Sequence, residues 1–150
     1  MDCGYARVIV FGMGRVGTGA YDEISERVGS AIVGVDRNEV ALVRHEEAGR
    51  RVVRGDALDR DFWERIRFQD VELVVVAMDT HASNLECVQR AREFLPGARI
   101  AAIATYSDQV AELRRADVDV ARNLYEEAGQ GLADDAMTAV FGPQNPPKTA

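Results

Sequence analysis

The chain is predicted to fold as a doubly wound α/β domain, with about six parallel strands and helices on both faces of the sheet. Short apolar, β-branched segments alternate with helical segments along residues 7–141. This alternation is typical of parallel sheets that are covered by their crossover helices. The length of 150 residues suits one such domain, and no linker divides it.

Six strands are expected, each a short apolar run. The fourth run, VELVVVAM, is almost uniformly apolar, which is typical of a central strand buried on both faces. The expected strands are residues 7–11, 31–35, 51–53, 71–78, 99–104 and 118–124.

A helix is expected after each strand. Apolar residues recur at helical spacing after the first strand, Gly49 closes the second helix, and Asp59 or Asp61 caps the third. The fourth helix ends at Pro96, and SDQVAELRRA and EEAGQGLADDAMTAV form the last two. Residues 1–6 are expected to be an N-terminal lead. Residues 142–150, with three of the four prolines, are expected to be a flexible tail.

The composition excludes several classes of function. A formal charge of -7 and a single lysine argue against a nucleic-acid partner. Cys3 and Cys87 lack the spacing of a disulfide framework or a zinc site, so buried or incidental thiols are expected. The apolar runs are shorter than the roughly 18 residues that a membrane span requires, and no signal peptide begins the chain. We expect no membrane insertion and a cytoplasmic location.

The segment GMGRVG, between the first strand and the first helix, matches the GxGxxG pattern of Rossmann-type dinucleotide-binding domains. Gly12 would form the tight turn, Gly14 would let a pyrophosphate approach the backbone, and Gly17 would let the helix pack on the strand. The amides of the first helical turn would then hold the phosphates. Arg15 could cover a phosphate or remain solvated.

Asp36 ends the second strand, nineteen positions after Gly17. A carboxylate there accepts hydrogen bonds from a ribose diol and repels a 2'-phosphate, which favours NAD-type ligands or adenine nucleotides over NADP. Arg37 weakens that exclusion. The alternative is a turn that only packs a helix on a strand, with Asp36 capping the next helix.

Asp56 and Asp79 each follow a strand and are expected at the same edge of the sheet, where open α/β folds bind ligands. Asp56 would meet the adenine, and the Asp79 region the ribose or nicotinamide. Both could instead be helix caps. His45 and His81 are isolated in the sequence, so surface or capping roles are expected for them.

Enzymatic activity is not expected. Only about twenty residues and the tail follow the mononucleotide-binding units, which leaves no room for a substrate domain. None of the four tyrosines is followed by lysine four positions later, and GxxxxGK[ST] is absent. A domain that binds a nucleotide without transforming it is a regulatory module.

Several segments resemble the RCK N-terminal domain, also called TrkA-N or KTN. They are VIVFGMGRVG, VGVD, the GDA after the third strand, and LVVVAMD with Asn84-Leu85 soon after. The resemblance runs over residues 7–131 and is strongest to the Kef-type glutathione-regulated potassium efflux systems.

This resemblance implies a ligand-controlled gate in which NAD(H), AMP, ADP or ATP binds at the glycine-rich turn. Paired domains, in a homodimer or a higher homo-oligomer, would shift against each other to open or close a membrane potassium pathway. The chain would thus lie at the inner face of the membrane through its transporter partner. By resemblance, the ligand would be bound by Gly12, Met13, Gly14, Arg15 and Val16 at the phosphates, Asp36 and Arg37 at the ribose, Asp56 and Ala57 at the adenine, and Ala77, Met78 and Asp79 at the fourth strand.

The chain departs from these relatives in two respects. Many carry an arginine at the end of the fifth strand, where this chain has Ala104 and Thr105, so phosphate contacts would be fewer or supplied by Arg15. The transmembrane and additional C-terminal domains of relatives are not in this sequence. A separate membrane subunit or an excised domain would explain this.

Two other functions compete with the sensor. One is a small NAD-dependent oxidoreductase or a degenerate relative, for which His81 is the nearest candidate for a reactive group. The other is an interaction module that has lost its ligand, which the intact Gly12, Gly14, Gly17 and Asp36 argue against.

Overall fold

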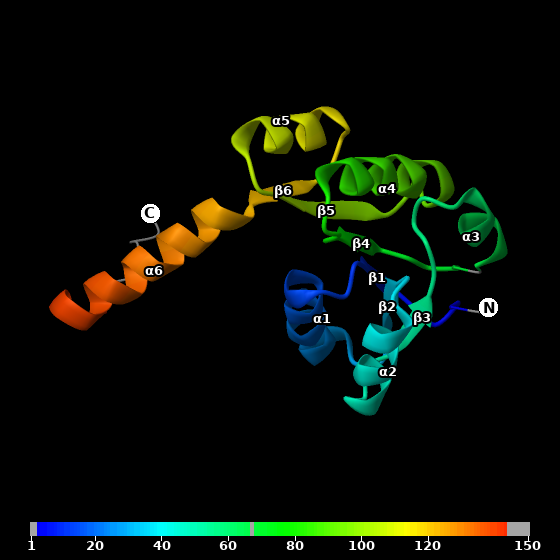
Figure 1. Cartoon of the computed structure of the whole chain (residues 1–150), viewed down its shortest axis with the longest axis horizontal. Coiled ribbons are helices and arrows are strands. Elements are labelled where there is room, and N and C mark those ends of the chain that lie inside the picture. The colour runs from blue at the N-terminus through cyan, green and yellow to red at the C-terminus, as the bar shows by residue number, and fades with distance from the viewer. Residues whose placement is uncertain (1–2, 67, 144–150) are drawn as a thin grey trace, which may run out of the picture.

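A computed structural model describes residues 3–66 and 68–143 of the chain (Figure 1). The six strands form one parallel sheet in the order β3-β2-β1-β4-β5-β6, which confirms the predicted fold. The segment predicted to be central lies beside the first strand in the middle of that order. The strands are β1 (Val8–Phe11), β2 (Ile32–Asp36), β3 (Val52–Arg54), β4 (Leu73–Val76), β5 (Arg99–Ala104) and β6 (Val120–Asn123).

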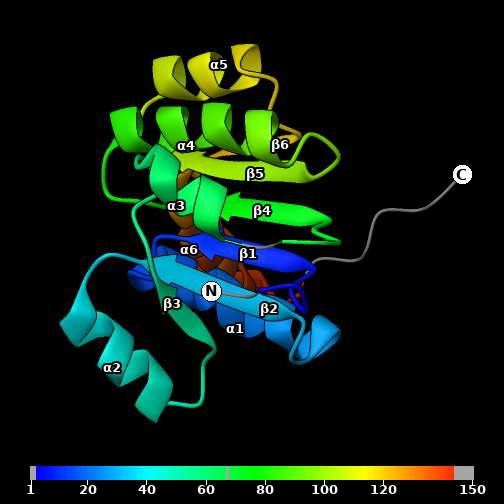
Figure 2. The ribbon, with the colours of Figure 1, turned by 90° about the vertical axis from the view of Figure 1, so that its right-hand side faces the viewer.

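Five helices cover the two faces of the sheet (Figures 1 and 2). The first two lie against one face and the next three against the other, as expected of a doubly wound sheet. They are α1 (Arg15–Val28) and α2 (Glu39–Glu47), then α3 (Arg60–Arg65), α4 (His81–Phe94) and α5 (Ser107–Arg115).

Successive residues of β1 enter different cores because side chains alternate across a strand. Ile9 and Phe11 face α3, α4 and α5, whereas Val8 and Val10 face α1. On the first of these faces the Trp63 ring lies 5.0 Å from the Phe11 ring, and its Nε1–H donates to the carbonyl of Ala57 at 2.8 Å. This buried indole holds the loop after β3 at the carboxyl edge of the sheet.

The chain leaves β1 toward α1 on one face and leaves β4 toward α4 on the other. The carboxyl ends of these neighbouring strands therefore feed loops that diverge. A crevice at such a point is where open α/β sheets bind ligands.

The last helix, α6 (Leu124–Phe141), does not pack against the sheet, although we expected it to be part of one compact domain. None of its residues is buried, and it runs away from the sheet (Figure 1). The cause is local: Asn123 is both the last residue of β6 and the N-cap of α6, so no loop exists to turn the helix back. Among the described helices, none is long and apolar enough to cross a membrane.

The segments that flank the predicted domain are ordered parts of the structure where they are described. Cys3 and Ala6, which we assigned to an N-terminal lead, are buried in the core. Cys87 is buried as well, which confirms the expectation for the two thiols. Gly142 ends α6 at a φ of 79°, and residues 144–150 of the predicted tail lie outside the described residues.

Candidate functional site

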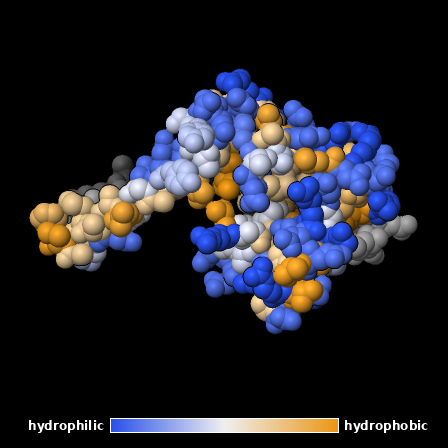
Figure 3. Space-filling model, viewed as in Figure 1, coloured by the Kyte–Doolittle hydropathy of each residue, from blue (hydrophilic) through white to orange (hydrophobic). Residues whose placement is uncertain are grey.

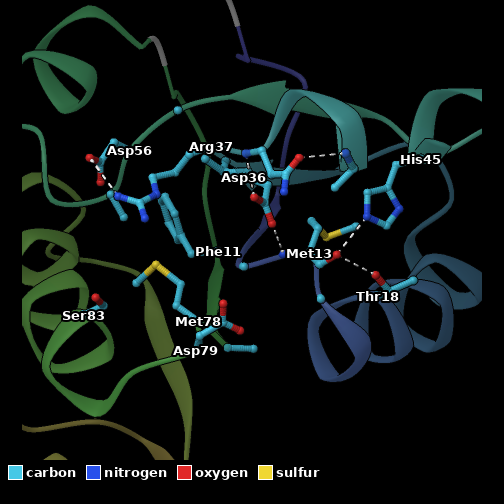
Figure 4. Close-up of a pocket in the computed structure, with 18 of the residues that line it drawn as sticks. Phe11, Met13, Thr18, Asp36, Arg37, His45, Asp56, Met78, Asp79 and Ser83 are labelled. Atoms are coloured by element: carbon cyan, nitrogen blue, oxygen red, sulfur yellow. Dashed lines mark hydrogen bonds and ion pairs between the residues drawn. The ribbon is translucent and has the colours of Figure 1, made fainter. Parts of the chain in front are cut away.

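A pocket of about 1080 Å³ lies at the carboxyl ends of β1, β2, β3 and β4 (Figure 4). The structure brings together there all but two of the residues that we predicted to bind a ligand. Val16 and Gly17 do not line it. Those that do are Gly12, Met13, Gly14, Arg15, Asp36, Arg37, Asp56, Ala57, Ala77, Met78 and Asp79.

The three glycines of the β1–α1 turn meet different surroundings. Gly12 has a φ of 91°, and a Cβ atom there would lie 2.5 Å from the carbonyl oxygen of Ala77. A Cβ atom on Gly17 would lie 1.6 Å from the carbonyl oxygen of Gly12. A Cβ atom on Gly14 would meet nothing within 4 Å. Gly12 and Gly17 are therefore required by the protein itself, whereas the space at Gly14 is open to the pocket.

The N-terminus of α1 faces this open space. Gly14 is the N-cap and has no side chain to accept hydrogen bonds from the first turn, which also contains no acidic residue. The first amides of a helix have no carbonyl partner inside the helix, and they carry a partial positive charge. This end of α1 is thus suited to an anion such as a diphosphate.

Asp36 links the strand β2 to the glycine-rich turn. Its Oδ2 accepts a hydrogen bond from the Met13 amide at 2.9 Å, and its Oδ1 accepts one from the Asn38 amide at 2.9 Å. A carboxylate has about four acceptor positions, so two remain for a ribose diol. The Met13 amide is already bound to Asp36, which leaves the amides beyond it for phosphate.

The alternative in which the three aspartates are helix caps is wrong. The N-caps of α2, α3 and α4 are Asn38, Asp59 and Thr80, and each accepts a hydrogen bond from the first turn of its helix. Asp56 instead accepts from the amide of Leu58 at 2.9 Å, and its carboxylate lies 3.9 Å from the Arg37 guanidinium. Asp59 was one of the two predicted caps of α3.

The charge of the pocket is opposite in sign to that of the whole chain. Four arginines and three aspartates line the pocket, whereas the chain carries a formal charge of -7. Ala104 and Thr105, at the position where relatives were expected to carry arginine, do not line it. The arginines, which suit an anionic ligand, are Arg15, Arg37, Arg44 and Arg50.

His45 lines the pocket, so the surface role that we expected for it is wrong. His45 is 9% exposed, and its Nε2 lies 2.8 Å from the carbonyl oxygen of Met13. Thr18, also missed, donates from its hydroxyl to the same oxygen at 3.1 Å. The sequence contained one signal, since His45 follows the buried Leu42 by three residues on the inner face of α2.

A pair of charged residues supports His45. Arg50 donates to both carboxylate oxygens of Asp22 at 2.8 Å, and its Nη1 lies 3.4 Å from Nδ1 of His45. The hydrogen bond from Arg50 lowers the pKa of Asp22. Asp22 therefore stays ionised and holds the guanidinium beside the imidazole.

Asn84 supports the opposite wall of the pocket. Its side chain is buried, accepts from the amide of Met78 at 2.8 Å and donates to the carbonyl of Met78 at 3.1 Å. It thereby fixes the backbone just after β4, where Asp79 follows. The sequence does not predict this role of Asn84, because an amide side chain in a helix does not reveal its backbone partner.

His81, the candidate reactive group of an oxidoreductase, does not line the pocket. It is the first residue of α4, and its Nε2 lies 2.9 Å from Oε2 of Glu112 on α5. Glu112 is 31 positions away from His81, so no local pattern along the chain predicts that the two residues pair. The imidazole of His81 thus connects α4 to α5, which lie on the same face of the sheet.

The chain is similar to proteins of potassium transport and to nucleotide-binding domains. Residues 8–124 match the TrkA-N domain. The glutathione-regulated potassium-efflux system protein KefC of Enterobacter sp. (strain 638) is 30% identical over 127 residues, which are 81% of this chain and 20% of that protein. The chain thus spans about a fifth of the length of this curated relative.

Three solved structures have similar folds. The NAD(P)-binding domain of an exopolyphosphatase-related protein from Archaeoglobus fulgidus is 18% identical, with a TM-score of 0.78 over 89% of this chain and 98% of that one. The AMP-bound Kef CTD of Shewanella denitrificans is 22% identical, with a TM-score of 0.70 over 89% and 80%. The GsuK channel bound to NAD is 19% identical, with a TM-score of 0.73 over 86% and 23%.

The sequence match extends from β1 to the start of α6 and so includes the glycine-rich turn, Asp36 and the β4 edge. It covers well over half of the chain, and the solved structures share the Rossmann-like sheet. The chain therefore belongs to the TrkA-N domain family.

Proposed function

We propose that this chain is a regulatory domain that binds NAD(H) or an adenine nucleotide (AMP, ADP or ATP) and gates a membrane potassium transport or efflux system. The observation that carries the proposal is the open space at Gly14, where the N-terminus of α1 and the Asp36 carboxylate line one pocket. A diphosphate at the helix end and a ribose diol on Asp36 would use both groups at once.

The ligand classes are supported by the named relatives. The Shewanella denitrificans Kef domain was solved with AMP and GsuK with NAD, and both share this fold. In this chain the phosphates would lie on the amides after Met13, beside Arg15. Arg37 and Asp56 would flank the adenosine.

Binding without turnover distinguishes the sensor from an oxidoreductase. The lining contains one histidine, His45, and its Nε2 is committed to the Met13 carbonyl. We therefore propose that the domain does not transfer hydride. An oxidoreductase would oxidise NADH when it is offered carbonyl substrates, whereas the sensor would leave the NADH absorbance unchanged.

Isothermal titration of the purified chain with NAD, NADH, AMP, ADP and ATP tests the proposed ligand. We expect saturable binding of at least one of them, with NADP weaker than NAD because Asp36 repels a 2'-phosphate. If none binds to the wild-type chain, the nucleotide-sensing function is wrong and only a scaffold role remains.

The regulatory role is tested in cells that lack this chain. Wild-type protein should restore normal potassium retention, while Gly14→Asp, expressed at the same level, should not. If Gly14→Asp restores potassium retention as well as wild type, nucleotide binding is not the signal that the transport system reads.

We also propose that the domain pairs with a second copy of itself through α6. Apolar side chains cover much of the surface of this helix and make it orange in Figure 3, while Glu127, Asp134 and Thr138 lie together on a narrow polar side. Leu132 is 72% and Phe141 76% exposed. The apolar side carries two i, i+4 rows, with Glu126 and Gln130 among the second: Leu124, Ala128, Leu132, Ala136 and Val140, and Tyr125, Gly129, Ala133, Met137 and Phe141.

The same chain carries an uncovered surface for this helix. α1 packs against β1 and β2, but Ala101 and Ile103 of β5 remain partly exposed on that face, and Val120 of β6 is 45% exposed. The α6 helix of one copy would cover this face of a second copy, and the reverse. Such a contact is isologous and closes as a two-fold dimer.

Light scattering tests the pairing. Leu132→Asp with Val140→Asp should convert a dimer to a monomer, because both charges lie on the apolar side of α6. Thr138→Asp adds a charge on the polar side of the same helix and should leave the dimer intact. A monomeric wild-type chain would contradict the proposal and would leave α6 to a different partner, such as the transporter.

A further inference from the structure

The backbone of Met13 is held by side chains at both of its polar groups. Its amide donates to Oδ2 of Asp36 at 2.9 Å. Its carbonyl oxygen lies 2.8 Å from Nε2 of His45 and accepts from the Thr18 hydroxyl at 3.1 Å (Figure 4). The turn before α1 is therefore positioned by residues of β2, α2 and α1, and its shape does not depend on the glycines alone.

The partners of His45 determine where its proton lies. A backbone carbonyl can only accept, so Nε2 must carry a hydrogen. Nδ1 faces Nη1 of Arg50 at 3.4 Å, and a guanidinium can only donate, so Nδ1 must carry the lone pair. The geometry thus points to the neutral Nε2–H tautomer, held in place by Arg50 and, through it, by Asp22.

This contact sets the direction of the next amide. A trans peptide is planar, and its C=O and N–H groups point in opposite directions. Because His45 and Thr18 hold the Met13 carbonyl, they also fix the Gly14 N–H, which points the opposite way within the same peptide plane. Gly14 is the residue at which the pocket opens, and its amide lies at the N-terminus of α1.

We propose that His45 is a positioning residue for the anion-binding turn, acting through the Met13 carbonyl to hold the Gly14 amide toward a ligand diphosphate. The inference rests on the proposed nucleotide-binding function and deepens it. A leucine would fill the volume between α2 and the turn but would leave the Met13 carbonyl with one donor fewer. A neutral hydrogen bond contributes roughly 1 kcal/mol, which corresponds to about a fivefold change in affinity.

Two substitutions separate the hydrogen bond from the packing. His45→Gln keeps an N–H donor at the end of the side chain, whereas His45→Leu removes it. We expect His45→Leu to weaken NAD binding about fivefold in calorimetry at about pH 8, and His45→Gln to bind within about twofold of wild type. If the two variants weaken binding equally, or His45→Leu binds as wild type does, the positioning role is wrong.

The second histidine of the chain provides the matched control. His81→Gln and His81→Leu change an imidazole whose Nε2 also has a polar partner, Glu112, but which lies outside the pocket lining. Both should bind NAD as wild type does. A loss in the His81 variants equal to that in His45→Leu would show that the effect does not come from the turn, and would overturn the proposal.

A spectroscopic measurement tests the contact without any ligand. The ¹⁵N shifts of the imidazoles should show His45 as the Nε2–H tautomer at about pH 8, and the Gly14 amide signal should move in His45→Leu but not in His45→Gln. An Nδ1–H tautomer would overturn the inference. If wild type binds none of the nucleotides, the proposed function fails, while this measurement still decides whether His45 holds the turn.

Discussion

Gly14 differs from the other two glycines of the β1–α1 turn because the fold itself does not require a glycine there. A side chain at Gly12 or Gly17 would collide with backbone atoms, but one at Gly14 would extend into the open pocket. The pattern GxGxxG predicted three different tasks from the sequence. The structure separates the two that are internal from the one that faces outward.

Gly14→Asp should abolish nucleotide binding and leave the fold intact. Its carboxylate would occupy the diphosphate position, yet aspartate is a favoured N-cap, so the free energy of unfolding should stay the same or rise by about 0.5 kcal/mol. Calorimetry and thermal melting check the two parts. Gly19→Asp, with the same charge on an exposed and open position of α1, should bind as wild type does. Equal loss in both variants would contradict the assignment.

Asp36→Ala should weaken NAD binding about tenfold and narrow the preference for NAD over NADP. The substitution removes the hydrogen bond from the Met13 amide, together with the proposed acceptor of the ribose diol and its repulsion of a 2'-phosphate. Titrations of both dinucleotides measure the ratio of their affinities. An unchanged ratio would place the ribose elsewhere in the pocket.

Cys87 should be chemically silent in the folded chain. Burial raises the pKa of its thiol well above the usual range, and only the thiolate is nucleophilic. Iodoacetamide at about pH 8 should therefore leave Cys87 unmodified until urea unfolds the protein, as mass spectrometry of the labelled peptide can show. Labelling of the native chain would reveal local opening of α4.

At the scale of elements, the sequence predicts the strands but not the side-chain contacts that hold the loops of the site in place. Apolar runs identified all six strands to within two residues at each end, because buried parallel strands consist of little else. The contacts that position the site, such as His45 on Met13 and Asn84 on Met78, join residues in different elements or loops. No periodicity along the sequence records such contacts.

The ionised side chain of Asp119 holds the start of β6 in place. Its Oδ2 accepts from the Ile100 amide at 2.8 Å and from Arg92 at 3.1 Å, so it joins the start of β6 to β5 and α4. The hydrogen bond from the Ile100 amide, with Arg92, lowers the pKa of Asp119. A carboxylate with a lowered pKa stabilises the fold at pH values above its unfolded pKa, and this stability is lost as the pH falls through the folded value.

Asp119→Ala should therefore lower the free energy of unfolding by about 1 kcal/mol at neutral pH. The difference from wild type should shrink below about pH 4, where carboxylates of unfolded chains become protonated. Urea unfolding at several pH values provides the measurement. Asp134→Ala, on the exposed polar side of α6, serves as the control and should change stability little at any pH. A difference that is independent of pH would show that the charge of Asp119 is irrelevant.

For the whole molecule, binding should appear as added stability. A ligand that binds only the folded state at about 100 times its Kd adds roughly 2.7 kcal/mol, which for a domain of this size raises Tm by about 5–10 °C. Saturating nucleotide should produce this shift in wild type and none in Gly14→Asp. A shift of equal size in the variant would mean that the ligand binds outside the pocket.

The direct junction between β6 and α6 has a mechanical consequence. Eighteen helical residues span about 27 Å, and they begin at Leu124, directly after the last residue of β6 and without an intervening hinge. A rotation of about 10° at the edge strand would then carry the tip near Phe141 through about 5 Å, since the helix amplifies angle into displacement over its length. A small tilt of the edge strand would thus move the tip of α6 far enough to change its contacts with a neighbouring protein.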